Sequence, residues 1–127
     1  MAQQVEIVAT AMRLAYLAFR GLAGPVGAGW VARAEELLAS EPESGAHAWL
    51  AVYRLIAALV GGRLDDAMEH ADLALEIARR HDDPSASAMA LSFKGMAEVA
   101  RGRWQEGVAL SDQAAAAAMS GNLELRI

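Results

Sequence analysis

The sequence predicts an all-α fold, arranged as an α-solenoid of about three antiparallel helical pairs in a single domain. Alanine and leucine dominate its 127 residues, and no long segment shows the period-two alternation of a β-strand. The 11 glycines and three prolines are too few for a loop-rich β domain. A pattern in residues 61–78 also returns forty positions later, in residues 101–118. A repeat of this length containing two helices is typical of α-solenoids.

Glycine and proline divide the chain into six predicted helices. The first spans about 4–20 and ends near Gly21. After a glycine-rich connector over 21–29, the second spans 30–40 and ends before Pro42. Proline disfavours helical backbone at the preceding residue, which accounts for this end.

Capping residues mark the next four helices. Ser44 is the expected N-cap of the third helix, which ends at 61–62, and the fourth fades at 81–82. Asp83–Pro84 combines a capping carboxylate with a proline at the first helical position, so the fifth helix starts there. Gly102 separates the fifth helix from the sixth. The helices form three pairs, over about 4–40, 44–81 and 84–120, and 121–127 is a tail or the start of a truncated repeat.

The second and third pairs are copies of each other. Gly62–Arg63 returns as Gly102–Arg103, and Tyr53–Arg54 faces Phe93–Lys94 when the copies are aligned forty apart. A fainter copy lies upstream, where Gly29 matches Gly62 at an offset of 33. One pair cannot bury both of its faces, so successive pairs are expected to stack. The alternative is a six-helix bundle without solenoid order.

The repeated positions resemble those of tetratricopeptide repeats: a glycine ends the first helix of a pair and small residues follow in the second. The residues concerned are Gly62, Ala67, Ala71, Ala74, Gly95, Gly102, Gly107 and Ala114. The segments "GWVARAEELL", "GGRLDDAMEHADLALEIARRHDDP" and "ALSFKGMAEVARGRWQEGVALSDQAAAAAMSG" are similar to the repeat region of bacterial LuxR-type, MalT-like transcriptional regulators. The resemblance implies a scaffold for protein contacts or signal reception. DNA binding and ATP use are not implied, because the chain has neither a Walker-type glycine loop nor a basic recognition helix.

Charge and composition favour a cytoplasmic protein that binds neither nucleic acid nor membrane. The net charge is −5, whereas a nucleic-acid binder carries clustered Lys and Arg. The absence of cysteine fits a reducing compartment. The apolar segment "AWLAVYRLIAALV" is shorter than the ~20 residues that a membrane span needs, and Arg54 lies within it.

No catalytic, cofactor or metal site is expected. The three histidines lack the close spacing of metal ligands and are predicted to be surface residues; they are His47, His70 and His81. Four carboxylates follow one face of the fourth helix with arginines after them, as on a solvated helix face. These carboxylates are Asp65, Glu69, Asp72 and Glu76. The protein is therefore predicted not to be an enzyme.

Two apolar surfaces are candidate binding sites. If the pairs stack, their first helices line a concave groove for an amphipathic helix or apolar peptide, with Arg54 and Lys94 holding an acidic partner. The alternative for each apolar member of this groove is the core. The expected apolar members are Trp49, Val52, Ile56, Met89, Phe93 and Met96.

The end of the chain is the second candidate surface. The sixth helix presents small side chains, the tail is apolar, and the mean hydropathy of +0.21 is high for a small domain. These features predict self-association as a two-fold dimer. The expected contacts are Ala115, Ala118, Met119, Leu123, Leu125 and Ile127. A protein-interaction module is thus the predicted function, and a receptor enclosing a small molecule is the alternative.

Overall fold

The computed structural model describes residues 25–120, and every regular element within that range is an α-helix. The all-α prediction is therefore confirmed for this part of the chain. The helices are α3 (Pro25–Ala39), α4 (Gly45–Val60), α5 (Leu64–Arg80), α6 (Pro84–Ala100) and α7 (Trp104–Ser120). The predicted first helix and the tail lie outside the described residues.

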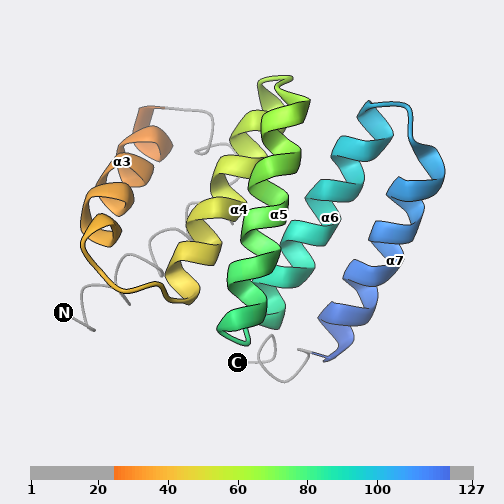
Figure 1. Ribbon diagram of the computed structural model, residues 1–127. Helices are drawn as coiled ribbons and strands as arrows, with labels where there is room; N and C mark the ends of the chain where they lie inside the picture. Colours follow the sequence, from red (N-terminus) through yellow and green to blue (C-terminus); the bar gives the residue numbers. More distant parts are fainter. Residues whose placement is uncertain (1–24, 121–127) are drawn as a thin grey trace.

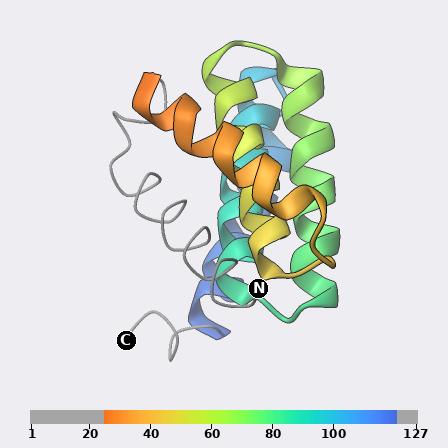
Figure 2. The ribbon, with the colours of Figure 1, turned by 90° about the vertical axis from the view of Figure 1, so that its left-hand side faces the viewer.

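The helices stand side by side in chain order, and consecutive helices run in opposite directions (Figure 1). Each packs on the next, and α4 also packs on α6. A view from the side shows α3 inclined across α4 (Figure 2). No helix in the described range is both long and apolar enough to cross a membrane.

Most predicted helix ends are observed. Ser44 is the N-cap of α4, and Asp83 caps α6 by accepting a 3.1 Å hydrogen bond from the backbone N–H of Ala86. The prediction was wrong at 25–29, where the expected connector forms the start of α3. Pro25 suits the first helical position because its ring fixes φ near the helical value and its missing N–H would have no helical partner there.

The three turns from α4 to α7 share one geometry at intervals of twenty residues. Gly62, Asp82 and Gly102 each have a positive φ, of 74°, 48° and 85°. The residue after each donates its N–H to a carbonyl five positions back, as Arg63 does to Ala58. This pattern satisfies carbonyls that a helix end would otherwise leave unpaired. The forty-residue repeat therefore contains two turns of the same kind.

Large side chains of α4 and small side chains of α5 and α6 make up most of the core. Val52, Leu55 and Ile56 of α4 are almost fully buried. Facing helices contribute alanines, which allow close approach: Ala67, Ala71, Ala74, Ala86, Ala90 and Ala97. Burying a side chain such as Leu or Ile contributes about 1.5–3 kcal/mol to the stability of the fold. The large buried residues of α4 are therefore a major source of that stability.

Candidate functional site

The second-pair members of the predicted groove lie in the core. Val52 and Ile56 are at most 1% exposed and Trp49 is 7% exposed. The indole Nε1–H of Trp49 donates a 3.0 Å hydrogen bond to Oδ2 of Asp83, so the carboxylate that caps α6 also fixes Trp49. The structure therefore gives these three residues a packing role, which was the alternative left open for each of them.

The third-pair members are more accessible. Met89 and Phe93 are half-buried and pack against the core, whereas Met96 is 54% exposed. The repeat thus places equivalent residues in different surroundings, since Ile56 is buried and Met96, forty positions later, is exposed.

The two cations of the predicted groove pair with acids of the protein itself. Nη2 of Arg54 lies 3.1 Å from Oε1 of Glu35 on α3. Nζ of Lys94 lies 2.7 Å from Oδ1 of Asp72 on α5. Each cation therefore joins its helix to the helix directly before it.

At the predicted self-association end, the described residues differ in exposure. Met119 is 78% exposed, Ala115 is exposed and Ala118 is half-buried. Leu123, Leu125 and Ile127, the other members of this predicted surface, lie outside the described residues.

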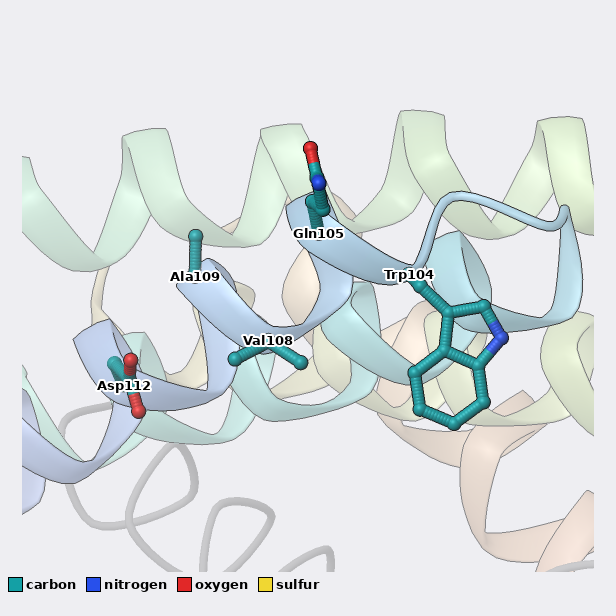
Figure 3. Close-up of a pocket in the computed structure, with 5 residues that line it drawn as sticks. All are labelled: Trp104, Gln105, Val108, Ala109 and Asp112. Atoms are coloured by element: carbon teal, nitrogen blue, oxygen red, sulfur yellow. The ribbon is translucent and has the colours of Figure 1, made fainter.

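The outer face of α7 carries further large apolar side chains that are exposed. Trp104 is 68% exposed and Val108 is 51% exposed. These residues, with Gln105, Ala109 and Asp112, line an open depression of about 450 Å³. Figure 3 shows Trp104, Val108 and Asp112 following one another along α7, as expected for residues spaced by four. These five residues are called the α7 outer face below.

Two glycines meet where α6 and α7 pack against each other. A Cβ at Gly107 would lie 2.5 Å from Cγ2 of Val99 and 2.9 Å from the carbonyl oxygen of Gly95. A Cβ at Gly95 would lie 3.0 Å from the carbonyl oxygen of Gly107. Helices α6 and α7 therefore approach too closely for a larger side chain at positions 95 and 107, and Leu110 of α7 lies beside the same contact.

Asp112 is the acidic residue of the α7 outer face. It is exposed, and within residues 25–120 no cation pairs with it. Asp72, its counterpart forty residues earlier, is paired with Lys94. The α7 outer face thus combines an apolar surface with one carboxylate that pairs with no cation of the described helices.

Several titratable groups elsewhere have roles in the structure itself. Hydrogen bonds from Arg80 and then His81 lower the pKa of Glu43 to about 2, from an ordinary value of 4.5. Burial raises the pKa of Tyr53. His47 contacts the backbone of Ser44 and of Leu38. Among the described residues, no three His, Asp or Glu side chains gather as a metal site would require.

A second hollow, of about 470 Å³, lies between α5, α6 and α7. It is open to solvent and has a mixed lining, in which Leu75 and Leu91 lie near Lys94 and Gln113. Arg79, Asp82 and Asp83 add charge to its edge, so apolar contact would be interrupted there.

The sequence interpretation did not select Trp104 or Val108. The sequence contained a signal for them. The forty-residue alignment pairs Trp104 and Val108 with Leu64 and Met68, which lie on a predicted helix that is followed by another predicted helix. The exposure of these two residues depends on three-dimensional packing.

Comparisons with models of protein families, with curated proteins and with solved structures found no match for this chain.

Proposed function

We propose that this chain is a non-catalytic protein-interaction module that binds a helical segment on the α7 outer face. The observation that carries the proposal is the exposure of Trp104 and Val108 on one side of a helix, beside an open depression. Aromatic residues such as Trp dominate binding energy at protein interfaces when they become desolvated. An exposed helix face of this kind suits helix-to-helix packing.

The arrangement of the helices supports an extended array as the scaffold for this surface. Consecutive helices pack in chain order, and the three turns from α4 to α7 repeat every twenty residues. Such order is in keeping with a tetratricopeptide-like solenoid, and with the resemblance to repeat regions of bacterial transcriptional and signalling regulators. Exposed apolar surface grouped on one side of a helix is typical of an interaction site. The α7 outer face is largely apolar and so favours a partner.

Site-specific photocrosslinking tests this function. A photoreactive amino acid replaces Val108 in one protein and Val60 in a matched control, because Val60 is also an exposed valine, 61% exposed, but lies at the end of α4. Both proteins are irradiated in extract of the source cells. We expect position 108 to form an adduct whose crosslinked peptide comes from a helical segment, and position 60 to form none.

A variant in the same experiment can contradict binding at the α7 outer face. Trp104→Ala in the position-108 protein should remove the adduct while circular dichroism shows unchanged helix content. An adduct of equal yield from positions 108 and 60, or one that survives Trp104→Ala, would place partner binding elsewhere. An adduct with a small molecule alone would favour the receptor function over protein interaction.

A further inference from the structure

The repeat shows which kind of helix covers a face like that of α7. Leu64, Met68 and Asp72 of α5 stand forty positions before Trp104, Val108 and Asp112. Helix α6 packs on α5, and both Leu64 and Met68 are half-buried rather than exposed. Lys94 of α6 reaches Asp72 on this side of α5, so α6 lies beside it and is a precedent for the occupant of the α7 outer face.

Charge pairing accompanies this packing in both places where it is described. Lys94 of α6 pairs with Asp72 of α5 at 2.7 Å. Arg54, forty positions before Lys94, pairs with Glu35 of α3 at 3.1 Å. In each case the covering helix presents a cation to an acid on the helix it covers. Asp112 occupies the position of that acid on α7 and has no such cation within residues 25–120.

A second copy of the chain fits this face less well than a helix that carries a cation. Asp112 is the midpoint of α7, Trp104–Ser120, so an antiparallel two-fold contact with full overlap would place two Asp112 carboxylates side by side. Like charges in direct opposition repel each other. The two cations that α4 and α6 present to preceding helices, Arg54 and Lys94, are already paired.

From these observations, and resting on the helix-binding function above, we propose that the α7 outer face binds an amphipathic helix of another protein that presents Lys or Arg to Asp112. The apolar side of that helix packs on Trp104 and Val108. The cation repeats the contact that Lys94 makes with Asp72. The carboxylate selects among apolar helices, because an acidic residue at the same position would be repelled.

A peptide of residues 83–100 tests the proposal, because it is α6 with its own Asp83 cap. The labelled peptide is titrated with the full chain by fluorescence anisotropy, and a K94E peptide is titrated in parallel. We expect K94E to weaken binding by about two- to fivefold, the range for an exposed ion pair. D112K in the full chain should weaken the binding of the unchanged peptide by a similar factor. The K94E peptide should bind the D112K chain with the original affinity.

Two variants separate contact at this face from general effects. E106K makes the same change of net charge on an exposed residue of α7 that does not line the depression, and should leave the affinity unchanged. Trp104→Ala should weaken the binding of both peptides by at least about fivefold, the loss expected for an interface hot spot.

The outcomes separate this inference from the function on which it rests. Equal affinity of both peptides for the unchanged chain, or equal weakening by E106K and D112K, would overturn the charge selection and leave helix binding intact. Absence of binding by either peptide, or binding that survives Trp104→Ala, would overturn both. A dimer in sedimentation equilibrium that Trp104→Ala dissociates would show instead that a second copy occupies the face.

Discussion

In the α4–α5 hairpin, large side chains of one helix pack against alanines of the other, whereas the α6–α7 hairpin closes at Gly95 and Gly107. The forty-residue alignment places Leu55 opposite Gly95 and Ala67 opposite Gly107. The turns are equivalent in both hairpins, but the interiors are not. The two copies of the repeat therefore share the geometry of their turns but differ in the positions of their bulky residues.

The consequence is a division of roles between the hairpins. The first keeps Val52, Leu55 and Ile56 in the core, and the second leaves Met96, Trp104 and Val108 exposed. Buried apolar area stabilises the fold, and exposed apolar area is available to a partner. Substitutions in the two hairpins should thus have different effects on stability and on binding.

Removing a core side chain from the first hairpin should have the largest effect. Leu55 is fully buried, so Leu55→Ala should lower the free energy of unfolding by about 2–5 kcal/mol, through lost burial and the cavity left behind. Val108→Ala in the second hairpin removes exposed atoms and should change that free energy by less than about 0.5 kcal/mol. Urea denaturation followed by circular dichroism measures both, and equal losses would refute the division of roles.

Adding one methyl group to the second hairpin should have the next largest effect. Gly107→Ala introduces a Cβ only 2.5 Å from Val99 and 2.9 Å from a backbone oxygen, so the helices must separate. We expect a destabilisation of about 1–3 kcal/mol, as for overpacked cores, in spite of the higher helix propensity of alanine. Thermal unfolding provides the measurement.

Gly29→Ala is the matched control for this substitution. Gly29 is exposed in α3, and a Cβ there would meet nothing within 4 Å. Alanine should therefore stabilise the chain by about 0.4–1 kcal/mol, by reducing the freedom of the unfolded state. If both variants gained stability, the close approach of α6 and α7 would be disproved.

Local signals allowed much of the fold to be predicted from the sequence. Ser44 and Asp83 are caps whose preference is a property of a few neighbouring residues, and the structure confirms both. The start of α3 was missed because the glycines around Pro25 are equally compatible with a loop, although Pro25 is well suited to the first position of a helix.

The candidate site was less accessible to prediction. Helical spacing groups Trp49 with Val52 and Ile56, but it does not say whether another helix covers them. Trp104 shows the same limit, because its exposure of 68% depends on which helices lie beside α7. Exposure is set by the neighbours of a helix, and periodicity describes only the helix itself.

Exchanging residues at the equivalent turns should give smaller effects. Gly102 has φ of 85°, where a side chain is disfavoured, so Gly102→Ala should destabilise by about 1 kcal/mol. Asp82 has φ of 48° in the turn between the hairpins, so Asp82→Gly should relieve strain and stabilise by about 0.5 kcal/mol. Opposite shifts of the melting temperature are expected, and shifts of the same sign would contradict the equivalence of the turns.

The smallest expected effect concerns an ion-pair cluster in the first hairpin, where Glu43 accepts hydrogen bonds from Arg80 of 2.6 and 2.8 Å and Arg80 also binds Glu76. The second hairpin has no equivalent, since Ser120 stands forty positions after Arg80.

Because the pKa of Glu43 is lowered from 4.5 to about 2 on folding, its stabilising effect is fully present above pH 4.5 and is lost as the pH falls towards 2. Glu43→Gln should flatten the fall in melting temperature over this interval, and Glu36→Gln, which alters another exposed carboxylate, should not. Identical pH profiles for the unchanged chain and Glu43→Gln would show that the cluster does not contribute to the stability of the first hairpin.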